Sequence, residues 1–329
     1  MSDSFCRIEV SDIDLTDLRY DIGSNDGGQG DNQVTSAYLD TLSRSIHALG
    51  PASPPIVRHE ADRYILISGF NRVKALTLSG SKTVWVLKAA PGTSELDCLK
   101  RAIAVKAFNR PLSPFELIRA VTLLSGFISS KEICGQAPLL FNTALNRGYI
   151  DQLNEIAELP DPALALIQTG RLSVKAAKKL LEFPGGDIRI FLSVFERLNA
   201  SSSKQLEMIL FLKEIAARDK ISIRDASFQL NLSQILDDGS ADAAAKLRQL
   251  REKLYSSRFP ELSKKYTRVQ QVVQSLKLGK GIKFTPPENF EHPSYTLSFQ
   301  SDSLEDFLAK VSRISQCAKG DAIKEIFDP

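Results

Sequence analysis

Residues 64–76 read YILISGFNRVKAL, and this stretch decides the fold class of the N-terminal part of the chain. It begins with an apolar run rich in β-branched and aromatic side chains, which is typical of a buried strand. Gly69 then favours a tight turn that leads directly into a helix carrying Arg72 and Lys74. Backbone N–H groups at such a helix start, next to cations, suit an anion such as a nucleotide phosphate. The alternative is an ordinary strand–helix connection in which Arg72 points into solvent.

The sequence on either side of this stretch predicts an α+β domain over residues 1–92. Short β-rich runs bounded by Gly, Pro and Asp alternate here with apolar residues at helical spacing. The expected strands cover residues 5–10, 54–58, 64–67 and 83–87, the expected helices cover residues 35–49 and 71–79, and the Gly-rich residues 23–31 are expected to form a flexible loop.

The pattern turns helical from Ser94 onward, which predicts a helical domain over residues 93–235. Proline and glycine residues divide this domain into short helices, because both residue types disfavour a helix interior. The breaks are expected at Pro111, Gly170 and residues 135–138, 160–162 and 184–186.

The last part of the chain changes character twice. Residues 236–279 form an expected basic linker, in which residues 243–276 are one long helix or a helix pair interrupted at Pro260. Residues 280–329 are expected to form a small ββα domain. Its strands cover residues 281–285 and 295–300, and its helix covers residues 303–314, with Leu304, Phe307, Leu308 and Val311 on one face.

Composition excludes several classes of protein. With 329 residues, 43% of them apolar and 25% charged, the chain is neither disordered nor fibrous and is long enough for two or three domains. No apolar run is long enough to span a membrane, and the first residues do not resemble a secretory signal, so we expect a cytoplasmic protein. The four cysteines lack CxxC spacing and there are only three histidines, which argues against a zinc site.

The charge distribution is more informative than the total of 42 basic and 39 acidic residues. The first 60 residues hold four arginines and ten carboxylates, a net charge near −6. Residues 241–285 hold eleven Lys and Arg residues and three carboxylates, a net charge near +8. A basic segment of this kind suits a phosphate backbone, although a solvated helix face is the simpler alternative.

Several short motifs follow one another in an order that carries a family resemblance. They are LSRSI at residues 42–46, PPIVR at 54–58, Ile67, Gly69, Arg72 and Ala75, LSPFE at 112–116, LPDP at 159–162, and Ile167, Gly170, Arg171, Leu172, Ser173, Ala176 and Ala177. This order resembles the ParB/RepB family of bacterial chromosome and plasmid partition proteins. The resemblance implies an α+β ParB/sulfiredoxin-like domain, an all-α helix-turn-helix domain that reads a centromere-like DNA site, and a small α+β C-terminal dimerisation domain.

The resemblance also implies a CTP site with Mg²⁺, but the chain departs from the family there. The family pattern Gly-Glu-Arg-Arg reads GFNR at residues 69–72, and Ser53 replaces a Gln linked to CTP hydrolysis. The Glu-Asn-x-x-Arg segment reads VKAFNR at residues 105–110, without the carboxylate that would bind Mg²⁺. We therefore expect weak or absent CTP hydrolysis. Residual nucleotide binding would rest on Gly69, Arg72, Lys74, Arg58 and Arg110.

The resemblance places a helix-turn-helix after residue 127. Ser129 or Ser130 is the expected N-cap of the first helix, and residues 146–155 are the expected recognition helix. The segment between them, residues 135–145, is longer than the usual turn, and the acidic residues of the second helix either pair with basic neighbours or weaken its contact with DNA. The expected DNA-binding residues are Lys131, Asn146, Arg147, Tyr149, Gln152, Arg171, Lys175, Lys178 and Lys179.

The resulting function hypothesis is a dimeric protein of the bacterial nucleoid that binds double-stranded DNA in partition or related regulation. A ParA-like ATPase is a partner of many such proteins, but the basic N-terminal arm that engages it is not evident here. Two alternatives stay open. One is a nucleotide-dependent kinase or nuclease, for which His59, Glu60 and Asp62 are the nearest reactive side chains, and the other is a nucleotide-free scaffold.

Overall fold

The computed structural model describes residues 2–23, 36–50, 53–287, 290, 292, 294–320, 323 and 327. The chain divides into two compact units, Met1–Ile209 and Leu210–Pro329. Most of the loop expected at residues 23–31 lies outside the described residues. No helix in the described part of the chain combines the length and the apolar character that crossing a membrane requires.

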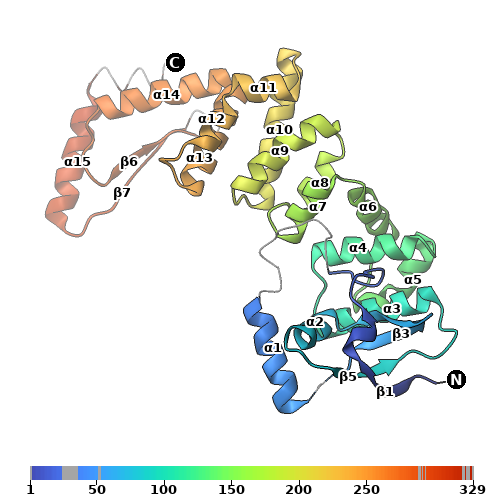
Figure 1. The fold of residues 1–329 in the computed structure, drawn as a ribbon. Helices are drawn as coiled ribbons and strands as arrows, with labels where there is room; N and C mark the ends of the chain where they lie inside the picture. The colour runs from blue at the N-terminus through green and yellow to red at the C-terminus, as the bar shows by residue number, and fades with distance from the viewer. Residues whose placement is uncertain are drawn as a thin grey trace. The chain divides into compact units, whose positions relative to one another are not determined.

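A five-stranded mixed sheet organises the start of the first unit (Figure 1). Its strands lie in the order β1-β5-β3-β4-β2, with β1–β5 and β3–β4 antiparallel and β2–β4 and β3–β5 parallel. The elements are β1 Ser4–Glu9, a short 3-10 turn Val10–Asp12, β2 Ile13–Asp14, α1 Ser36–Leu49, β3 Ile56–Glu60, β4 Arg63–Ser68, α2 Phe70–Leu78, β5 Thr83–Lys88 and α3 Glu95–Asn109. The expected α+β class of this region is confirmed.

Helices pack on both faces of the sheet. Successive side chains of β4 point to opposite sides, so each face buries some of them. Leu66 belongs to the core under α2, together with Phe70 and Val73. Ile65 and Ile67 are also buried, on the other side, where α3 packs against β4. This three-layer arrangement fixes the Gly69 turn between the sheet and α2.

A run of short helices follows the sheet (Figure 1). They are α4 Pro114–Ser125, α5 Ser130–Phe141, α6 Arg147–Ala157, α7 Asp161–Gln168, α8 Val174–Leu180, α9 Gly185–Arg197 and α10 Ser202–Asp219, the last of which crosses the boundary between the units. Local signals set their starts. Ser113 with Glu116, and Ser129 with Glu132, form complete capping boxes at α4 and α5.

The break expected at residues 135–138 is wrong. Helix α5 runs without interruption from Ser130 to Phe141 and contains Pro138. Its apolar side buries Ile133, Ala137 and Leu140, and this burial offsets the hydrogen bond that a proline removes from a helix. The helix ends at Asn142, whose left-handed backbone (φ 52°) is a common helix terminator. The connection to α6 is therefore much shorter than the segment that the sequence suggested.

The second unit contains the end of α10 and the remaining elements. These are α11 Ile223–Gln229, α12 Leu232–Asp237, α13 Ala243–Arg258, α14 Pro260–Ser275, β6 Ile282–Thr285, β7 Thr296–Phe299 and α15 Leu304–Ala318. The basic segment is a helix pair, with Pro260 at the first position of α14. β6 and β7 form an antiparallel hairpin, and the small core beside it contains Val272, Leu276 and Leu278.

Candidate functional site

The Gly69 turn is built on a position that only glycine fills without strain. Its backbone is left-handed, with φ 98°, and it is the N-cap of α2. A Cβ atom added here would lie 3.0 Å from both Cα and Cβ of Pro55. Gly69 therefore allows the residue before β3 to pack closely against the turn between β4 and α2.

A cavity with a volume of about 890 Å³ lies between the start of α2 and the end of α3. Its lining includes Tyr20, Asp21, Gly23, Gly69, Arg72, Lys74, Lys106, Arg110, Glu116 and Gln168. Four of the five residues expected to bind a nucleotide are thus brought together, namely Gly69, Arg72, Lys74 and Arg110. Its size is suitable for a small-molecule ligand.

Arg72 and Lys74 differ in their surroundings. Arg72 Nη1 donates to the backbone oxygen of Ser53 and, at 3.2 Å, to the Ser53 hydroxyl. Burial lowers the pKa of the Arg72 guanidinium from its ordinary value, although it stays charged at neutral pH. Lys74 is half-buried and has no ion-pair partner among the residues that the structure describes.

Glu116 is the most constrained charged group in the cavity and is only 5% exposed. Arg110 binds it through two hydrogen bonds of 2.6 and 2.8 Å, and Lys106 Nζ lies 2.8 Å from Oε1. The Ser113 backbone N–H donates to Oε2 at 2.8 Å. Burial alone would raise the pKa of this carboxyl, but Arg110 and Lys106 outweigh it and lower the pKa to about 2.

Glu116 should therefore make the folded state sensitive to acid. Its pKa is about 2 in the fold against an ordinary 4.5, so its stabilisation is complete above pH 4.5 and is lost as the pH falls toward 2. The contribution is about 2 kcal/mol, after allowance for the partly exposed Arg110 and Lys106. Urea unfolding at pH 3 and pH 7 should show a smaller pH dependence for Glu116→Gln than for wild type. The exposed Glu158→Gln is the control, and equal pH dependence of Glu116→Gln and wild type would contradict this assignment.

The cavity fits a Mg²⁺ ion poorly. Mg²⁺ requires oxygen ligands, usually carboxylates, in a near-octahedral arrangement. Both oxygens of Glu116 are already bound, and Asp21 Oδ1 accepts the Gly23 N–H at 2.8 Å. Within the described part of the chain, no group of three His, Cys, Asp or Glu side chains is placed to hold a metal ion.

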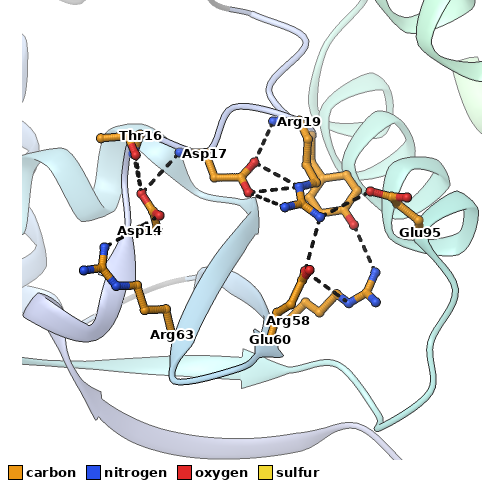
Figure 2. Close-up of polar contacts among 9 residues, drawn as sticks. Asp14, Thr16, Asp17, Arg19, Arg58, Glu60, Arg63 and Glu95 are labelled. Atoms are coloured by element: carbon orange, nitrogen blue, oxygen red, sulfur yellow. Dashed lines mark hydrogen bonds and ion pairs between the residues drawn. The ribbon is translucent and has the colours of Figure 1, made fainter.

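Arg58 lies outside this cavity. Figure 2 shows it beside Glu60. Its guanidinium donates a hydrogen bond to the Tyr20 hydroxyl at 3.3 Å. Glu60 also pairs with Arg19, which in turn contacts Glu95 at 3.3 Å. Arg58 therefore supports the wall formed by Tyr20 rather than facing a ligand in the cavity.

Helices α5 and α6 form the second candidate site. Asn146 is the N-cap of α6, and its side chain accepts the Tyr149 N–H at 2.8 Å. Asp151 accepts from the Ser130 hydroxyl at 2.6 Å and lies 3.9 Å from Arg147. These contacts tie the start of α5 to α6, and they show that Asp151 is engaged with its neighbours.

Helix α8 packs against α6 and supplies further cations. Lys178 Nζ donates to Gln152 Oε1 at 3.0 Å, which joins the two helices at the surface. Lys175 is exposed, as is Lys131 at the start of α5. The cations on α5, α6 and α8 thus belong to helices that contact one another.

Two of the expected DNA-binding residues are engaged elsewhere. Lys179 pairs with Glu182 at 2.6 Å, and Arg171 donates to the backbone oxygen of Glu196. Tyr149 is half-buried. The side chains of Lys179, Arg171 and Tyr149 are therefore less available to DNA than those of Lys131, Lys175 and Lys178.

Sequence reasoning missed the part that Lys106, Glu116 and Asp21 play in the cavity. One signal was present, because Lys106 and Arg110 are four residues apart, a spacing that brings side chains together along a helix, although Arg110 is the C-cap of α3 in the structure. The segment containing Asp21 carries no sequence signal that predicts its place in the cavity. Arg119 Nε donates to its backbone oxygen at 2.8 Å across 98 residues, and Gln168 Nε2 donates to Gly23 O at 3.2 Å across 145 residues.

Comparison with known proteins gives one curated relative with significant similarity. No family model matches the chain. The "Probable chromosome 1-partitioning protein ParB" of Deinococcus radiodurans is 26% identical over 182 residues, which is 55% of this chain and 60% of the relative. The chain thus spans about three fifths of the curated relative that it matches.

Solved structures of low sequence identity also match. Two are of C-terminally truncated ParB from Caulobacter crescentus. The complex with CTP-γ-S has 18% identity and a TM-score of 0.26, covering 59% of this chain and 99% of that one. The complex with the centromeric parS site has 15% identity and a TM-score of 0.34, covering 68% of this chain and 97% of that one. A Pnob8-like ParB-N domain has 13% identity and a TM-score of 0.36, covering 77% and 98%.

The sequence match and the order of motifs along the chain agree with each other. The aligned similarity to the D. radiodurans protein covers more than half of this chain. The architecture is also the one that the motifs imply, a mixed sheet followed by a long helical region. The chain is therefore a distant homologue of the ParB family of partition proteins.

Proposed function

We propose that the chain binds double-stranded DNA through α5, α6 and α8, at a centromere-like or operator site. In this arrangement α6 enters the major groove, where Arg147 and Gln152 face base edges. Lys131, Lys175 and Lys178 contact phosphates and set affinity and register. The observation that carries the proposal is the Lys178–Gln152 contact, because it joins a base-reading helix to a basic one.

Sequencing of DNA captured with the protein from its native cell tests this proposal. A single focused peak would indicate a centromere-like or operator site, and scattered peaks would indicate a general binder or a regulator of many sites. The double substitution Arg147→Ala with Gln152→Ala should abolish a focused peak. A peak that persists unchanged in this variant would contradict the role given to α6.

We also propose that the protein acts as a dimer through α15. The apolar face of this helix is exposed in the single chain, with Leu304 74%, Phe307 45%, Leu308 57% and Val311 40% exposed. A second copy of the chain would cover this face, as two apolar helix faces pack readily. A dimer would also present two DNA-binding units to a site with two halves.

Leu308→Asp should convert the dimer into a monomer, because it places a charge in an apolar interface. Analytical ultracentrifugation measures the change, and DNA affinity should fall with it. Ala309→Asp, an exposed position away from the apolar face of the same helix, is the control and should leave the dimer intact. A monomeric wild-type protein would exclude this interface, as would a dimeric Leu308→Asp variant.

CTP hydrolysis, in this proposal, is weak or absent. The carboxylate that would hold Mg²⁺ is missing from residues 105–110, and the carboxylates lining the cavity are engaged with protein groups. The absence of phosphate release from CTP, with and without DNA, is the expected result. The proposal does not include a ParA-like ATPase partner.

A further inference from the structure

The cavity beside Gly69 holds an excess of positive charge. Arg72 and Lys74 lie on one wall, which belongs to α2, and Lys106 and Arg110 lie at the end of α3. Only Asp21 and Glu116 among the lining residues carry negative charge. Cations from separate walls of a partly enclosed cavity create a local potential that favours an anion.

The two halves of this charge are not equivalent. Glu116 neutralises part of the charge on Lys106 and Arg110, which lie 2.8 and 2.6 Å from Oε1. Lys74 has no carboxylate partner among the described residues, and the hydrogen bonds of Arg72 go to Ser53, a neutral residue. An incoming anion would thus find two uncompensated cations on α2 and two that Glu116 already holds.

We propose that this cavity binds a phosphate-bearing polyanion directly through its cations, without a divalent metal ion, and that Glu116 competes with the polyanion for Lys106 and Arg110. The proposal goes beyond the proposed DNA function and does not rest on it. A chain of phosphates can replace the metal-mediated contacts by direct hydrogen bonds, because Arg and Lys bind phosphate oxygens well. The Ser113 N–H holds the Glu116 carboxylate in place. The carboxylate therefore stays in the cavity and lowers the affinity of the cavity for the polyanion.

Isothermal titration of the full-length protein with CTP and with inorganic tripolyphosphate tests the metal independence. Each compound is titrated once in EDTA and once in excess Mg²⁺. We expect both to bind in EDTA, with affinities no weaker than in Mg²⁺, since Mg²⁺ neutralises the charges that the cations recognise. Binding that requires Mg²⁺ would overturn the proposal, and so would the absence of binding under both conditions. DNA binding is measured in a separate experiment, so neither result of this titration decides whether the proposed DNA function is correct.

Two substitutions test the competition. Glu116→Gln keeps the shape and the acceptor for Ser113 N–H but removes the charge, so the affinity for tripolyphosphate should rise about tenfold. Lys74→Gln removes an uncompensated cation and should lower the affinity for tripolyphosphate about tenfold. Lys82→Gln, an exposed lysine outside this cavity, should change nothing.

Circular dichroism melting shows whether each variant is folded at the assay temperature. If Glu116→Gln is unfolded there, Lys74→Gln alone decides the test. A folded Glu116→Gln protein with unchanged or weaker tripolyphosphate binding would overturn the competing role of Glu116. Unchanged binding by Lys74→Gln would overturn the direct recognition by the α2 cations.

Discussion

Reversing the charges of Lys175 and Lys178 together should lower the affinity for double-stranded DNA about 100-fold. Both side chains are exposed on α8, and the polar contact of Lys178 is to the neutral Gln152. Their charges are therefore available to phosphates, and glutamates in their place would repel the same phosphates. Fluorescence anisotropy with a labelled duplex measures the change.

The control for this experiment must alter the net charge equally. Lys82→Glu with Arg44→Glu does so, because both residues are exposed and lie in the sheet region rather than on α5, α6 or α8. We expect this control to keep most of the wild-type affinity. Equal losses in the two double variants would mean that only total charge matters, which would contradict a DNA-binding surface on α8.

Leu153→Ala should destabilise the first unit by about 3 kcal/mol. Leu153 is fully buried on α6, which packs against α4 and α5, and truncation of such a residue leaves a cavity. Urea denaturation followed by circular dichroism measures the loss, read from the transition of the first unit. DNA affinity should fall at temperatures where the variant is partly unfolded.

Glu155→Ala, an exposed substitution two residues away on the same helix, is the matched control and should change stability by less than about 0.5 kcal/mol. A Leu153→Ala loss below about 1 kcal/mol would show that α6 is not packed as described.

Elements with local signals were predictable from the sequence. The expected recognition helix began at Asn146, which is the N-cap of α6, and of the two expected N-caps of α5, Ser129 and Ser130, the structure has Ser129. Pro260 was the expected interruption of the basic helical segment, and it begins α14. These signals are readable because caps and prolines act within one turn. The break expected near Pro138 failed for the opposite reason. The burial of Ala137 and Leu140 depends on tertiary packing, which overrides the local preference of a proline.

The cavity was predictable only in part. Gly69 is the N-cap of α2, and Arg72 and Lys74 lie within its first two turns, so the sequence alone placed them together. The segment ending at Gly23 reaches the cavity through long-range contacts with Arg119 and Gln168, and sequence spacing gives no sign of such contacts.

Strand position alone did not show where the Arg58 side chain ends. Arg58 pairs with Ile65, so it lies on the same face of the sheet as Ile67, which lines the cavity. Its guanidinium bonds instead to the Tyr20 hydroxyl, and Arg58 does not line the cavity.

The central claim is that this chain binds double-stranded DNA through its exposed cations. Titration of the wild-type protein with a duplex at several salt concentrations, from about 50 to 200 mM, tests it most directly. We expect a steep linear fall of log affinity with log salt concentration, because each phosphate contact releases condensed counterions. A flat salt dependence, or no binding at the lowest salt concentration, would contradict it.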